Sequence, residues 1–127
     1  MNLAILIGRL GNTPETRVTA KGTPQTSFTL VTNEIKKSSS GYEEVPEFHR
    51  CVCFGKLAES VAKHVVKGQL VSLEGRIKTR QYTSKDGEKR SITEIIVEKV
   101  EFHNKPQNKE QHYQPQIDES SIDDFIE

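Results

Sequence analysis

The chain has 127 residues, two cysteines and a formal net charge of zero. This length suits one domain whose core needs no disulfide or metal staples, and two cysteines are too few for a disulfide framework. The sequence shows no signal peptide and no run of the roughly 20 apolar residues that a membrane span needs, so we expect a soluble cytoplasmic protein.

The first part of the chain predicts two strands and a long connection. Residues 3–10 are rich in Leu and Ile, and residues 25–33 form a second strand in which Phe28 and Leu30 are expected to face the core. Residues 34–46 are polar and contain Ser-Ser-Ser-Gly and a proline, which indicates a long mobile hairpin loop.

A third strand and a helix follow. Residues 47–54 alternate in character, as the two faces of a strand do. The apolar residues of the next segment follow helical spacing, and Gly68 is expected just past the end of this helix. The residues with this spacing are Leu57, Val61, Ala62 and Val65.

Two further strands complete the body of the protein. Residues 70–82 form a long fourth strand in which Gly75 predicts a bend or bulge. A turn at 85–88 joins it to a fifth strand at 90–102. Five strands with one helix between the third and the fourth are typical of the all-β, five-stranded OB-fold barrel, which we predict for residues 1–103.

One face of the third strand carries His49, Cys51 and Cys53. A metal-dependent enzyme could use them, but the outer two would lie ~13 Å apart, too far for zinc bonds of about 2.0–2.3 Å. The sequence contains no hydrolase, P-loop, zincin or dinucleotide-binding motif. We therefore predict a buried face of small apolar residues, no metal or other cofactor, and no catalysis.

The other face of that strand presents Phe48, Arg50, Val52 and Phe54. Rings and cations together suit a single-stranded nucleic acid, because its phosphates pair with Lys and Arg and its unpaired bases stack on rings. The alternative is that Phe48 and Phe54 belong to the core and that the cysteine face points outward.

The fourth strand adds a row of like charges, in which Arg76, Lys78, Arg80 and Tyr82 alternate with uncharged residues. Because like charges repel, folding alone gains nothing from this row. We interpret it as a phosphate-binding track that ends in a stacking ring. A solvated basic edge of the sheet would show the same pattern and is the alternative.

The composition changes after His103. Residues 104–127 hold two lysines and six acidic residues, whereas residues 1–103 hold 16 Lys and Arg against 12 Asp and Glu. The acidic segment has too little apolar surface to order itself, so we predict a disordered linker and acidic tail. Apolar residues among its last acids predict a short peptide ligand for partner proteins. This ligand comprises Asp123, Asp124, Phe125 and Ile126.

Several blocks resemble the bacterial single-stranded DNA-binding proteins, including phage and plasmid versions, and they occur in the family order over about residues 2–98. The blocks read LIGRLGNTPETR, FTLVTNE, EFHRCVCFGKLAE, KGQLVSLEGRIKTRQY and DGEKRSITEIIVE. The resemblance implies an OB fold and a nucleoid-associated homotetramer without catalytic activity. It also implies sequence-independent binding of single-stranded DNA during replication, recombination and repair, with replication and repair proteins recruited by the tail.

The resemblance further implies roles for single residues. Base stacking would involve Phe48, Phe54 and Tyr82, and subunit contacts would involve His49. Phosphate contacts would come from Arg50, Arg76, Lys78 and Arg80.

The chain departs from the family pattern at two places. Many members carry a tryptophan just after TNE, where this chain has Ile35, Lys36 and Lys37, so binding is expected to depend more on phosphate contacts by the two lysines. The family tail has acids followed by Ile-Pro-Phe, whereas this chain reads DDFIE. An OB protein that chiefly binds other proteins is the remaining alternative.

Overall fold

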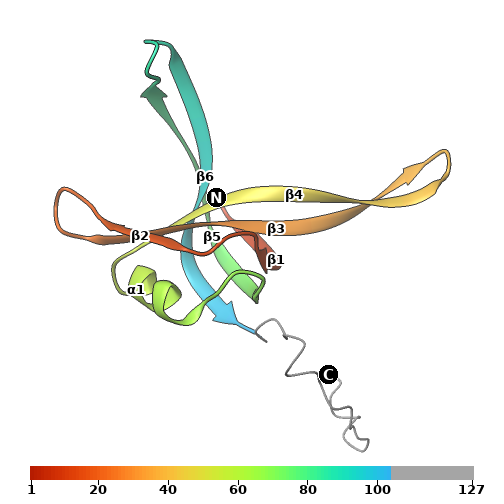
Figure 1. Cartoon of the computed structure of the whole chain (residues 1–127), viewed down its shortest axis with the longest axis horizontal. Coiled ribbons are helices and arrows are strands. Elements are labelled where there is room, and N and C mark those ends of the chain that lie inside the picture. Colours follow the sequence, from red (N-terminus) through yellow and green to blue (C-terminus); the bar gives the residue numbers. More distant parts are fainter. Residues whose placement is uncertain (104–127) are drawn as a thin grey trace, which may run out of the picture.

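The computed structural model describes residues 1–103, in which side chains at a spacing of two bury one face of the barrel strands. Phe28 and Leu30 are buried as predicted, and Thr29 between them is not. In chain order the elements are β1 (Ala4–Leu10), β2 (Glu15–Val18), β3 (Pro24–Ser38), β4 (Gly41–Phe54), α1 (Gly55–His64), β5 (Leu70–Thr83) and β6 (Lys89–Phe102) (Figure 1).

The strands pair in the order β1-β5-β6-β4-β3-β2, and β1 also pairs with β3. That additional pairing closes β1, β3, β4, β5 and β6 into a barrel, in which β4 and β6 are parallel and the other neighbours are antiparallel. The helix α1 connects β4 to β5. The predicted five-stranded OB-fold barrel with one helix is therefore confirmed, and β2 is a short addition beside β3.

The helix α1 packs one narrow stripe against the barrel. Ala58 and Val61 are buried in the core, and Val65 joins them just after the helix. The buried hydroxyl of Thr26 on β3 donates a 2.8 Å hydrogen bond to the carbonyl oxygen of Ala58, which ties the helix to the sheet. Within residues 1–103, no helix has the length and apolar character of a membrane span.

Two expectations about the helix are wrong. Ala62 is exposed, because the buried stripe is too narrow to include it. The helix also ends at His64, before the predicted end next to Gly68, since Val65 adopts an extended backbone and places its side chain in the core.

Residues 34–46 are not a loop. The strands β3 and β4 continue through them as a paired ribbon up to a turn at Ser39 and Ser40. The prediction failed because both faces of this ribbon are exposed to solvent along nearly its whole length. No alternation of apolar and polar residues therefore marks it as a strand. We call residues 34–46 the β3–β4 arm.

A second ribbon leaves the barrel beyond Gly75. The predicted bulge is present as a register shift between Glu74 and Gly75, and every residue of β5 after Gly75 is exposed. We call residues 78–92 the β5–β6 arm. Figure 1 shows that the two arms project from the barrel in different directions.

Candidate nucleic-acid interface

A groove of about 410 Å³ crosses the outer surface of β4, β6 and β5. Its lining combines cations with apolar side chains. The lining residues are Arg17, Gln25, Val52, Phe54, Arg76, Lys78, Arg80, Glu94 and Ile96. Four residues predicted to bind nucleic acid therefore meet in one hollow, namely Phe54, Arg76, Lys78 and Arg80.

A smaller hollow of about 180 Å³ adjoins the groove and shares part of its lining, including Val52, Arg80 and Glu94. It brings Arg50 of β4 beside Arg80 of β5. Phe54 and Arg50 of β4 and the cations of β5 therefore form one continuous surface.

The strand register explains why the two rows face the same way. Ile96 of β6 pairs with Val52 of β4 on one side and with Arg76 of β5 on the other. Paired residues point to the same face of a sheet, and alternate residues along a strand share that face. The row with Phe54 and the row with Arg80 therefore both point outward.

The opposite face of β4 lies in the core. Cys51 and Cys53 are fully buried, whereas Phe48 and Phe54 are 69% and 43% exposed. The alternative that places the two rings in the core is therefore wrong. Desolvation by burial raises the pKa of the Cys51 thiol to about 12 and that of Cys53 to about 11. Both thiols stay protonated at neutral pH and are poor nucleophiles.

The third residue of that face, His49, is only partly buried. Its Nε2 atom shares a 2.8 Å hydrogen bond with the hydroxyl of Thr32 on β3. In the part of the chain that the structure describes, no group of three or more His, Cys, Asp and Glu side chains is arranged to hold a metal ion.

Acidic side chains of β6 pair with the cations of the groove. Arg80 donates from Nε and Nη2 to the two carboxylate oxygens of Glu94, at 3.1 and 3.2 Å, and these hydrogen bonds raise the pKa of Arg80. Glu94 also lies 3.9 Å from Nε of Arg50, and Glu98 lies 3.5 Å from Nε of Arg76. Two cations of the basic row, Arg76 and Arg80, are therefore paired with acidic side chains of the neighbouring strand β6.

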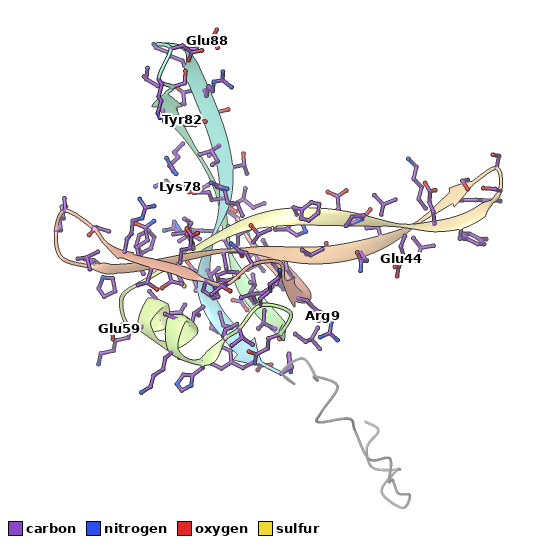
Figure 2. The ribbon with its side chains drawn as sticks, viewed as in Figure 1. Arg9, Glu44, Glu59, Lys78, Tyr82 and Glu88 are labelled. Carbon is purple, nitrogen blue, oxygen red and sulfur yellow. The ribbon has the colours of Figure 1, made fainter. Side chains whose placement is uncertain are left out.

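The other predicted residues lie outside the groove. Phe48 is next to the β3–β4 arm, and Lys36 and Lys37 lie within that arm, on opposite faces because they are consecutive. Figure 2 shows Tyr82 farther along the β5–β6 arm than Lys78, toward Glu88 near the tip. These residues flank the groove along the two arms.

Sequence reasoning missed two further candidates, Tyr42 and Arg17. Tyr42 is 75% exposed and pairs with Lys37 across the β3–β4 arm. It lies an even number of residues before Phe48 on β4, so the two side chains share one face of the strand. Alternation would have revealed Tyr42 if the segment had been interpreted as a strand. Arg17 reaches the groove because β2 pairs with β3 and places Arg17 opposite Gln25, and no local sequence pattern predicts that pairing.

Comparison with known proteins agrees with this geometry. The model of the Single-strand binding protein family matches residues 1–103. Single-stranded DNA-binding protein 3 of Listeria innocua is 41% identical over 108 residues, which are 85% of this chain and 67% of that protein. Single-stranded DNA-binding protein 1 of Chlorobaculum tepidum is 46% identical over 98 residues, 76% of this chain and 60% of that protein.

Two solved structures have a similar fold. A Plasmodium falciparum SSB in complex with ssDNA superimposes with a TM-score of 0.73 and 26% identity, over 82% of this chain and 96% of that one. A deletion mutant of the single-stranded DNA binding protein from Thermus aquaticus gives a TM-score of 0.71 and 34% identity, over 82% of this chain and 51% of that one.

Proposed function

Because this chain belongs to the single-strand binding protein family, we propose that it binds single-stranded DNA without sequence preference. The observation that carries the proposal is the groove in which Phe54 adjoins Arg76, Lys78 and Arg80. The cations suit phosphates and the ring suits an unpaired base, and neither contact depends on which base is present. By its family, the protein protects single strands at the nucleoid during replication, recombination and repair.

The two arms extend this surface. A strand that crosses the groove meets Tyr82 on the β5–β6 arm, and Phe48 lies beside the β3–β4 arm with Tyr42 farther out. Lys37 pairs with Tyr42, so a cation accompanies the outermost ring. Duplex DNA hides its base faces, so these rings favour single strands over duplexes.

Fluorescence anisotropy of labelled oligo-dT, titrated with protein at several salt concentrations, tests the proposal. We expect tight binding that weakens as salt increases and that duplex DNA of equal length competes poorly. RNA of equal length measures the preference for DNA. Equal binding to duplex, or binding only at very high protein concentration, would refute the proposal and favour a protein partner for the barrel.

Lys78 provides a prediction about phosphate contacts. Within residues 1–103 its ammonium group makes no ion pair, unlike the guanidinium groups of Arg50, Arg76 and Arg80. Lys78→Ala should therefore remove one phosphate contact and flatten the slope of log K against log salt by about 0.7. Lys63→Ala, in the last turn of α1, removes the same charge outside the groove and is the matched control. An equal change in both variants would mean that only the overall charge matters.

The chain is also proposed to form a homo-oligomer, a tetramer by its family. Support comes from the outer face of β1 and the residue before it, where Leu3, Ile5 and Ile7 are 50%, 64% and 64% exposed. A row of exposed apolar side chains along one strand is typical of a surface that a partner covers. Sedimentation equilibrium of the full chain measures the stoichiometry, and a monomer at micromolar concentration would contradict this proposal.

The acidic tail lies outside the described residues, and its proposed role is to recruit replication and repair proteins. We further propose that it competes with DNA for the basic groove. Deletion of residues 118–127 removes five acids and should tighten oligo-dT binding at low salt, with little effect at high salt. Deletion of residues 105–114 shortens the tail by the same length but keeps those acids. Unchanged binding at low salt after the first deletion would exclude the competition.

A further inference from the structure

The floor of the groove contains a buried carboxylate, which is unexpected on a surface proposed to bind a polyanion. The side chain of Glu94 is 8% exposed, whereas those of Arg50 and Arg80 are 56% and 51% exposed. A buried charge is costly unless it is paired, and both partners of Glu94 are arginines that also line the hollows. Glu94 therefore influences how many cations are free for phosphate.

The geometry of the Arg80 pair matches the geometry that a phosphate would adopt. Arg80 presents its Nε and Nη2 atoms as a fork, and Glu94 accepts from both at 3.1 and 3.2 Å. A guanidinium uses the same fork to bind a carboxylate or a phosphate. Glu94 thus occupies a position on Arg80 for which a DNA phosphate would compete.

Arg50 is placed to take over the carboxylate. Its Nε lies 3.9 Å from Glu94, which is too long for a hydrogen bond but close enough for a small side-chain movement to form one. Arg50 comes from β4 and Arg80 from β5, and β6, which carries Glu94, lies between them in the sheet. If Arg80 turned toward a phosphate, Glu94 would keep a partner in Arg50.

We propose that the carboxylate of Glu94 competes with DNA phosphates for the guanidinium group of Arg80. As a result, Arg50 and Arg80 together bind one phosphate of the strand instead of one phosphate each. Two guanidiniums and one carboxylate give this triad a net charge of +1, which one phosphate neutralises. The inference rests on the proposed function and adds a residue that limits affinity. When a phosphate leaves, Glu94 can pair again with Arg80, which favours release and movement of the strand.

The substitution Glu94→Gln tests this inference, because it removes the charge while keeping the size of the side chain and one oxygen acceptor. Both arginines should then bind phosphate. The slope of log K against log salt for oligo-dT should steepen by about 0.7, which corresponds to roughly tenfold tighter binding at about 20 mM salt and little change near 1 M. An unchanged slope, or weaker binding, would overturn the proposal.

Glu98→Gln is the matched control. Glu98 lies on the same strand and the same face and pairs with Arg76, but this pair has a single contact at 3.5 Å and Glu98 is 54% exposed. An exposed pair of this kind holds its arginine weakly, so we expect a much smaller change of slope. An equal change in the two variants would indicate a general charge effect and would overturn the proposal. If the wild-type protein itself does not bind oligo-dT, it is the proposed function that fails.

A measurement on the wild-type protein does not depend on how the variant folds. The NMR signal of the Arg80 Nε–H group, assigned with Arg80→Lys, should shift when oligo-dT is added, as Glu94 is exchanged for phosphate. The signal of Arg50 should shift in the same titration. If the protein binds oligo-dT and the Arg80 signal stays in place, Glu94 does not compete with phosphate.

Discussion

Replacing Tyr82 with Ala should weaken the binding of oligo-dT by about 1–3 kcal/mol, or roughly 5- to 150-fold, because one base loses its stacking partner. Tyr82 is 44% exposed on the β5–β6 arm, and no ring in residues 1–103 is stacked on it. Its removal should therefore affect the fold little. Anisotropy titrations at one fixed salt concentration measure the loss, and thermal unfolding of the same samples checks that stability is unchanged.

Two further variants separate stacking from other roles of Tyr82. Tyr82→Phe keeps the ring and loses only the hydroxyl, so it should bind oligo-dT nearly as tightly as the wild type. Tyr42→Ala removes a ring from the β3–β4 arm and reports whether the strand reaches that arm as well. If Tyr82→Ala binds as tightly as the wild type, the β5–β6 arm lies outside the DNA path.

The second large effect is expected for Gly75→Ala, which should lower the free energy of unfolding by about 1–3 kcal/mol. A methyl group at this position would overlap the carbonyl oxygen of Ile96 and lie 3.0 Å from the Cα of Val97. Both obstacles are backbone atoms of β6, so no side chain can move aside. This close approach lies at the register shift beside Gly75, just before the β5–β6 arm.

Chemical denaturation at a fixed protein concentration measures the effect of Gly75→Ala, since an oligomer's stability depends on concentration. Gly22→Ala is the control. Gly22 has a φ of 88°, but a methyl group there would meet no atom within 4 Å, so only backbone strain of about 1 kcal/mol is expected. Equal stability losses in the two variants would show that close packing at Gly75 contributes nothing.

Most of the barrel could be predicted from the sequence because its strands have one buried and one exposed face. Phe28 and Leu30 alternate with more exposed residues, and this local pattern marks a strand without knowledge of its neighbours. The same alternation placed Cys51 in the core and Phe54 outside, as the structure shows. Where both faces are exposed, in residues 34–46, the pattern is absent and the strands were mistaken for a loop.

The sequence by itself determined the order of the five barrel strands and the helix, the alternation that separates the rows of Phe54 and Arg80 from their neighbours, and the change of composition after residue 103. These properties depend on residues close together in the chain. Only the tertiary structure decided that Glu94 pairs with Arg50 and Arg80 and that Arg17 joins the groove. Strand pairing brings these residues together from distant parts of the chain, and the register of that pairing is a property of the closed barrel.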